Sequence, residues 1–116
     1  MRPDDIMTEM REYKSILQGK DDSVRELAER KADTQMAYRI AVASEVARLR
    51  LEGETATLSE LLAKGDFDVA QKKREAVVAE EVMKSCFESM KNARANMDLL
   101  RSLLAYESKE RFSRDV

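Results

Sequence analysis

Four basic residues come closest, by type and spacing, to a binding chemistry. They are Lys84, Lys91, Arg94 and Arg101. At 100° per helical residue they fall within about 100° of one another, a positive stripe that suits a phosphate backbone or a contact with a protein partner. Acids between them neutralise much of this surface, and charged flanks are typical of coiled coils. A solvated or interhelical flank is therefore the stronger interpretation, and the stripe is kept as the candidate partner-binding site.

The other side chains with possible chemistry are better explained by structure. Asp66 and Asp68 lack the further ligands of a calcium loop, so helix capping accounts for them. Cys86 falls on an apolar heptad position, where a thiol is buried and unreactive. The chain has no His, which excludes an imidazole base and His-ligated zinc. We predict no catalytic, cofactor-binding or metal site, and therefore a protein that is not an enzyme.

Composition restricts the elements that position these residues. The chain has 116 residues, with 21 Lys plus Arg against 23 Asp plus Glu, so its net charge is only −2. Such a balance argues against a whole surface built for nucleic acid or an anionic membrane. Because there are only 3 Gly and 1 Pro, few turns are possible and the chain must be nearly all helix. An aromatic content of 5% excludes a thick core.

Cysteine usage and the N-terminal residues favour a cytoplasmic protein. A single Cys cannot form an intramolecular disulfide, and a reducing compartment fits best. The N-terminal stretch is acidic where a signal peptide is basic and apolar. No stretch approaches 18 consecutive apolar residues, so we expect neither export by this route nor a membrane contact.

The longest predicted helix covers about residues 67–111. Within it, one set of apolar residues recurs every seven positions and a second set follows three residues later. The first set is Ala76, Met83, Met90, Met97 and Leu104, and the second is Ala79, Cys86, Ala93 and Leu100. This is the seam of a coiled coil, and its small residues favour close antiparallel packing. Val82, Phe87 and Leu103 are expected to widen it.

Upstream, helices are expected over about 4–17, 22–51 and 58–64. Gly19 leaves open whether the first two are separate. Gly53 suits a helix C-cap, and Thr57 with Glu60 reads as a capping box for the short helix. That helix has one apolar face, made of Leu58, Leu61 and Leu62. Gly65 ends it, and Asp66 is expected to cap the long helix.

The fold predicted from these elements is all-α. It is a long antiparallel, coiled-coil-like helical hairpin with a short helix at the turn, in one elongated domain spanning residues 1–116. A hairpin buries only one side of each helix and leaves apolar residues on other faces of the first one. These are Met36, Ala43, Ala47 and Leu51. We expect self-association into a bundle to cover them, because a narrow Ala-rich core seldom supplies enough stability alone.

Three stretches resemble a family of small helical proteins encoded by phages and prophages. They are Leu51–Leu58, the Lys64-Gly65-Asp66 step, and Ala93–Glu107 with its Leu-Arg-Ser-Leu segment. The resemblance spans about residues 20–110. Members of that family are commonly encoded beside single-strand annealing recombinases and single-stranded-DNA-binding proteins. The resemblance implies no catalytic residue, and it favours a role in early phage DNA handling or in countering host defence.

The leading hypothesis is a phage accessory protein that binds a protein partner of the DNA recombination or replication module. The alternative is an anti-defence inhibitor, for example an anti-CRISPR protein, that binds a host nuclease. A second alternative is single-stranded nucleic-acid binding. It is disfavoured by a pI of about 5.3 and by the absence of Trp, because stacking platforms need aromatic residues.

Overall fold

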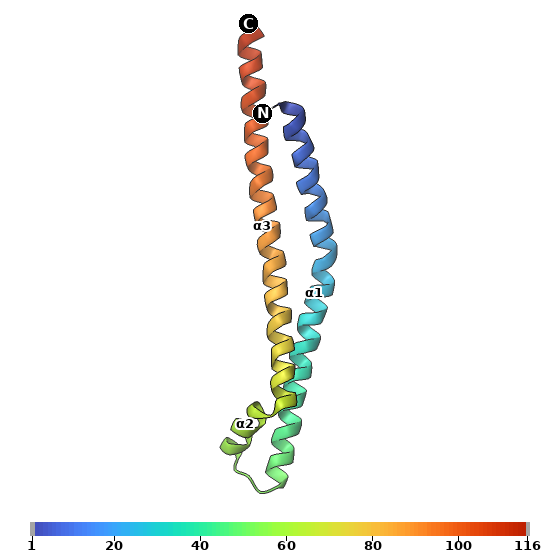
Figure 1. The fold of residues 1–116 in the computed structure, drawn as a ribbon, viewed down its shortest axis with the longest axis vertical. Coiled ribbons are helices and arrows are strands. Elements are labelled where there is room, and N and C mark those ends of the chain that lie inside the picture. Colours follow the sequence, from blue (N-terminus) through green and yellow to red (C-terminus); the bar gives the residue numbers. More distant parts are fainter. Residues whose placement is uncertain (1, 116) are drawn as a thin grey trace. The chain divides into compact units, whose positions relative to one another are not determined.

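The fold is all-α, as predicted. The computed structural model describes residues 2–115, with side chains described for residues 2–111. Its helices are α1 (Pro3–Leu51), α2 (Ala56–Gly65) and α3 (Phe67–Asp115) (Figure 1). Between residues 2 and 115 there is no β-strand. The two long helices are joined through α2, which gives the expected helical hairpin.

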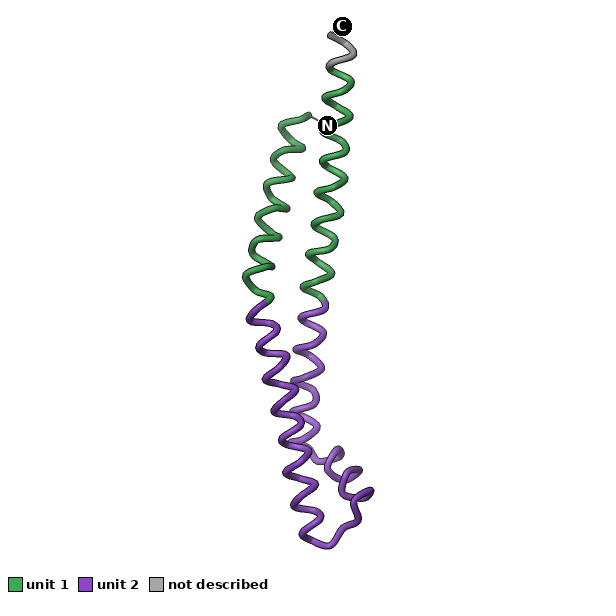
Figure 2. Tube along the Cα trace, turned by 180° about the vertical axis from the view of Figure 1, so that it is seen from behind, with its two compact units in different colours: residues 1–24, 85–116 green, residues 25–84 purple. Residues whose placement is uncertain are grey.

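The chain forms two compact units (Figure 2). Unit 1 takes in residues 1–24 and 85–116, and unit 2 takes in residues 25–84. Within each unit a segment of α1 lies antiparallel to a segment of α3, and unit 2 also contains α2. The single elongated domain over 1–116 stays a prediction from the sequence.

α1 continues through Gly19 without interruption, so the segments 4–17 and 22–51, whose separation the sequence left open, form one helix. An isolated Gly in a helix costs only about 1 kcal/mol relative to Ala, and the residues on both sides favour helix. The hydroxyl of Ser23 donates to the carbonyl oxygen of Gly19 at 3.0 Å, a contact within the helix and not a turn. The other helices also extend beyond the expected 58–64 and 67–111.

Gly53 ends α1 as expected. Its φ of +97° is left-handed backbone, which a residue with a Cβ rarely adopts. The amide of Gly53 donates to the carbonyl oxygen of Arg50 at 3.1 Å. The amide of Glu54 donates to the carbonyl oxygen of Leu49, also at 3.1 Å. This pair of hydrogen bonds is the Schellman motif, which satisfies carbonyls that the helix leaves open.

The N-cap of α2 is Thr55, not the expected Thr57. The Oγ1 atom of Thr55 accepts a hydrogen bond from the amide of Leu58 at 3.3 Å, while Thr57 already lies within the first turn. Thr55 has extended backbone, with φ −68° and ψ 159°, which an N-cap requires. The predicted capping box of Thr57 with Glu60 is therefore wrong, because the N-cap lies two residues earlier.

The heptad seam of α3 faces α1, as predicted. Most of its members are less than a tenth exposed: Ala76, Ala79, Cys86, Met90, Ala93, Met97 and Leu100. Val69 extends the seam by one heptad and is 3% exposed, while Met83 and Leu104 are half-buried. The flanking residues Val82, Phe87 and Leu103 keep 39–47% of their surface exposed, so they widen the seam only at its edge.

The facing side of α1 is less deeply buried. Ile6, Thr34 and Leu49 are the well-buried residues, while other inner positions such as Val42 and Val46 are half-buried. The hydroxyl of Thr34 donates within the helix to the carbonyl of Arg30 at 2.8 Å, so its burial leaves no unmet hydrogen bond. Two helices in antiparallel contact therefore share a narrow core in each unit.

α2 packs against the rest of unit 2 through its small residues, and its leucines do not make the main contact. Ser59 and Ala63 are 0% exposed, whereas Leu58, Leu61 and Leu62 are 42%, 65% and 46% exposed. Small side chains allow the backbone of α2 to approach its neighbours closely. The apolar face expected from the sequence exists, but it points largely outwards.

Candidate functional site

The four basic residues of the predicted site all lie on α3 and are all exposed, in different surroundings. Lys84 belongs to unit 2, and its Nζ lies 3.5 Å and 3.6 Å from carboxylates of Glu80 and Glu81. Arg101 belongs to unit 1 and pairs with Asp98 at 3.4 Å. These are exposed pairs one helical turn apart, of the kind that contributes little to stability.

Lys91 and Arg94 lie in unit 1, exposed on the same helix. Among the side chains of residues 2–111, neither has an ion-pair partner within 4.0 Å. The positive charge of the stripe is therefore locally neutralised at Lys84 and Arg101, and it is fully available only at Lys91 and Arg94.

Unit 1 also contains a groove between α1 and α3. It has a volume of about 280 Å³ and an apolar floor formed by Met7, Met10, Met97 and Leu104. We call it the Met groove. Met97 is 9% exposed and forms the deepest part, while Met7 is 42% exposed at the edge.

Three cations edge the Met groove: Arg11 and Lys14 from α1, and Arg101 from α3. None of its seven lining residues is acidic, although the chain as a whole carries more acids than bases. Arg101 is the one member of the predicted basic series that lines it. The groove therefore combines an apolar floor with a local excess of positive charge.

Arg11 and Lys14 were not predicted as site residues from the sequence. Their spacing with the methionines, at Met7, Met10, Arg11 and Lys14, follows the i, i+3, i+4, i+7 pattern of one helix face. That pattern was the available signal, but it does not tell which residues of α3 lie opposite. The structure brings this face against Met97, Arg101 and Leu104, which themselves stand at i, i+4 and i+7.

A second surface lies on the α1 segment of unit 2. Met36, Ile40 and Leu51 are 57%, 60% and 90% exposed, and Ala43 and Ala47 between them are also exposed. We call these five residues the outer stripe. At 100° per residue, the mean direction of these five residues is about 170° from that of Ile6, Thr34 and Leu49, the well-buried residues of α1. The outer stripe and the buried face therefore lie on opposite sides of the helix.

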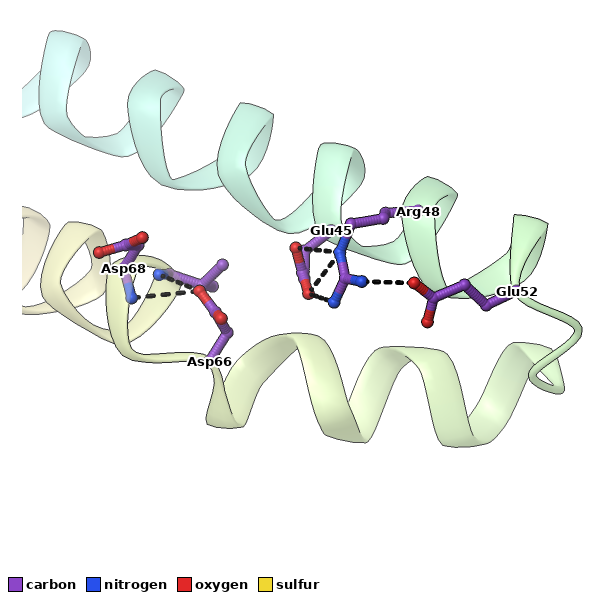
Figure 3. A network of polar contacts seen from close by, with 6 residues as sticks. Glu45, Arg48, Glu52, Asp66 and Asp68 are labelled. Atoms are coloured by element: carbon purple, nitrogen blue, oxygen red, sulfur yellow. Dashed lines mark hydrogen bonds and ion pairs between the residues drawn. The ribbon is translucent and has the colours of Figure 1, made fainter.

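The third cluster is polar and surrounds Arg48 at the C-terminal end of α1 (Figure 3). The Nε of Arg48 donates to both carboxylate oxygens of Glu45 at 3.2 Å, and its Nη1 donates to Glu52 at 2.7 Å. The hydrogen bond from Arg48 lowers the pKa of Glu45. The same hydrogen bond raises the pKa of Arg48, and the charges of Glu52 and Asp66 add smaller effects in the same direction. Arg48 and Glu52 are more than half exposed, whereas Glu45 and Asp66 are half-buried, so the cluster braces the helix end and does not form an enclosed site.

Asp66 and Asp68 lie at the start of α3 (Figure 3). The Oδ2 of Asp66 accepts hydrogen bonds from the amides of Asp68 and Val69, at 3.1 Å and 3.2 Å. This is the predicted N-cap. Cys86 is 7% exposed within the seam, which agrees with the expected buried thiol.

The described residues thus define an all-α helical hairpin with an apolar groove, an outer apolar stripe and mixed surface charge. No protein-family model, no curated protein and no solved structure matches the chain. In the part of the chain that the structure describes, no helix is long and apolar enough to cross a bilayer. The same residues contain no group of three or more His, Cys, Asp or Glu side chains able to hold a metal ion.

Proposed function

We propose that this chain is a non-enzymatic protein that binds a protein partner through the Met groove. The observation that carries the proposal is the juxtaposition of an apolar floor with the cations Arg11, Lys14 and Arg101, of which Arg101 pairs with Asp98, and no acid among the lining residues. Methionine side chains are flexible and polarizable, so they adapt to a partner's apolar groups. Helix-in-groove binding uses this combination of an apolar floor and a polar rim.

The partner class follows from the family resemblance. Proteins of that family are commonly encoded beside single-strand annealing recombinases and single-stranded-DNA-binding proteins. We propose a phage accessory role with one of these proteins as the partner, in the cytoplasm of the bacterial host. The alternative is an anti-defence inhibitor that binds a host nuclease through the same groove.

Direct binding of single-stranded nucleic acid is the weaker alternative. Lys84 and Arg101 already face carboxylates, which leaves Lys91 and Arg94 to contact phosphates. Two phosphate contacts release few counterions and support only weak, salt-sensitive binding. Charge reversal of Lys91 and Arg94 tests this alternative, because unchanged retention of a labelled oligonucleotide would exclude the stripe as its site.

We further propose that a second copy of this chain covers the outer stripe. Met36, Ile40 and Leu51 keep 57%, 60% and 90% of their surface exposed, so no described residue covers this face. The stripe repeats apolar residues at steps of four, three, four and four, close to the spacing of a helix-pairing seam, and Ala43 and Ala47 permit close approach.

Two matched variants test both proposals. Met7→Glu places a charge at the Met groove and Met36→Glu places one on the outer stripe. Both methionines lie on α1 and are partly exposed, at 42% and 57%. Tagged wild-type protein and each variant are used to capture partners from phage-infected host cells, and the molar mass of each purified protein is measured by light scattering.

We expect the wild type and Met36→Glu to retain a phage recombinase or single-stranded-DNA-binding protein, and Met7→Glu to lose it by about tenfold. A host nuclease in its place supports the inhibitor alternative. Recovery of no other protein, or equal recovery with Met7→Glu, contradicts binding through the groove. For self-association, Met36→Glu should lower the molar mass to that of a monomer while Met7→Glu leaves it unchanged. A monomeric wild type overturns that proposal.

A further inference from the structure

The Met groove has the dimensions and the charge of a site for one particular kind of segment. We infer that it binds an acidic amphipathic helix of the partner protein, with apolar side chains on one face and carboxylates beside them. This inference rests on the proposed protein-binding function and names the chemistry of the segment that would be bound.

The geometry sets the length of that segment. The lining residues of α1 span Met7 to Lys14, and those of α3 span Met97 to Leu104. Seven residue steps of helix extend about 10 Å, or two turns. A partner helix of two to three turns would therefore present two or three apolar side chains, at i, i+3 or i+4, and i+7, to the floor.

The charges set its composition. Arg11 and Lys14 stand on one wall and Arg101 stands on the other, so carboxylates on both flanks of an apolar face would each meet a cation. Asp98 already pairs with Arg101 at 3.4 Å, and both side chains are more than half exposed. An exposed pair of this kind contributes little, so a partner's carboxylate can replace Asp98 without a large penalty.

A basic or neutral helix would fit the groove less well. Either helix would gain the contact with the methionine floor. A basic helix would hold its cations beside Arg11, Lys14 and Arg101, where like charges repel, and a neutral helix would leave these three cations without carboxylates. An anionic lipid shares the acidic and apolar chemistry of the proposed segment. The groove is lined along two turns of two helices, which favours a helical segment, and lipid binding is therefore an outcome that the test must separate.

The probes are two synthetic helical peptides and a vesicle. Both peptides carry leucines at i, i+3 and i+7. One has glutamates at the flanking positions and the other has lysines there. The vesicle contains phosphatidylglycerol. Binding of the labelled peptides to the full-length protein is measured by fluorescence anisotropy at two salt concentrations, and binding to the vesicle is measured by co-sedimentation.

The protein variants are Arg11→Glu with Lys14→Glu, and the control Lys73→Glu with Arg74→Glu. Both pairs are exposed, and both make the same change of charge, but the control lies on α3 in unit 2. Circular dichroism is used to check that each variant keeps its helical content. We expect the acidic peptide to bind the wild type about tenfold more tightly than the basic peptide, with the preference shrinking at high salt. The groove variant should lose that preference and the control should keep it.

Equal binding of the two peptides, binding of neither at millimolar concentration, or an unchanged preference in the groove variant overturns the inference. Retention on vesicles without peptide binding overturns it in favour of a lipid. These failures differ from a failure of the proposed function: a partner captured by the wild type and lost with Met7→Glu would still establish protein binding at the groove, with a bound segment that is not acidic.

Discussion

The carboxylate of Asp66 accepts a hydrogen bond from the amide of Val69 at 3.2 Å, where α2 ends and α3 begins. The amide of Asp66 itself donates back to the carbonyl of Ala63 at 3.2 Å. One residue thus satisfies backbone groups of two helices. Because Val69 is 3% exposed and begins the seam of α3, this cap also sets where the packed part of that helix starts.

Asp66→Ala should therefore lower the free energy of unfolding by about 1 kcal/mol, the usual cost of losing an N-cap. The matched control is Asp68→Ala, which removes a carboxylate from the same first turn without removing the cap. Urea denaturation followed by circular dichroism measures both. A loss at Asp68 as large as that at Asp66 would contradict the capping role.

Two glycines of the chain should respond in opposite directions to the same change. Gly53→Ala forces a Cβ into backbone with φ +97° and should destabilise the protein by about 1–2 kcal/mol. Gly19 lies inside α1 with nothing within 4 Å of an added Cβ, so Gly19→Ala should stabilise by about 0.5–1 kcal/mol. Midpoints of chemical denaturation give both signs, and a stabilised Gly53→Ala would be inconsistent with the Schellman motif.

Ser59 has a buried hydroxyl oxygen that makes no hydrogen bond to any described residue. An unsatisfied buried polar atom costs free energy that an apolar group of similar size does not. Ser59→Ala should raise the free energy of unfolding by about 1 kcal/mol. Thr34→Val is the comparison, because the Thr34 hydroxyl is buried but bonded to the carbonyls of Arg30 and Lys31, and it should give no such gain.

The ion pair at Glu45 makes stability depend on acid pH. The hydrogen bond from Arg48 lowers the pKa of Glu45 from its ordinary value of 4.5. A carboxyl with a lowered pKa in the folded state contributes stability that is present above the unfolded pKa and is lost as pH falls through the folded pKa. The melting temperature of the wild type should exceed that of Glu45→Gln at pH 6, and the difference should shrink as the pH falls below 4.5 and disappear below the lowered pKa of Glu45. A difference that persists in acid would show that the effect is not ionic.

Tyr106 provides a test at alkaline pH. Its hydroxyl donates to the carboxylate of Glu110 at 2.9 Å, and this bond raises the pKa of Tyr106. The contribution to stability is present below the unfolded pKa and is lost as pH rises through the folded one. In a background with Tyr13→Phe and Tyr38→Phe, Glu110→Gln should move the ultraviolet titration of Tyr106 to lower pH. An unmoved titration curve would mean that the hydrogen bond does not form in solution.

The sequence by itself determined that the chain is nearly all helix and which face of the longest helix is buried. Heptad spacing placed Met90 and Ala93 in the seam, and both are buried, because the 3.6-residue repeat of a helix converts spacing directly into direction. Gly53 and Asp66 were recognisable because backbone geometry at helix ends favours particular residue types. Thr57 was predicted as the cap of α2 but Thr55 takes that place, because either hydroxyl can accept the same kind of hydrogen bond.

Only the tertiary structure decided which faces meet. It brought Met7 and Lys14 of α1 to the same groove as Met97 and Arg101 of α3, although 90 residues separate Met7 from Met97 in the sequence. It also packed Ser59 and Ala63 inwards and left the leucines of α2 outside. Periodicity is local and says which residues share one face, whereas the register and rotation of one helix against another depend on how closely their side chains pack.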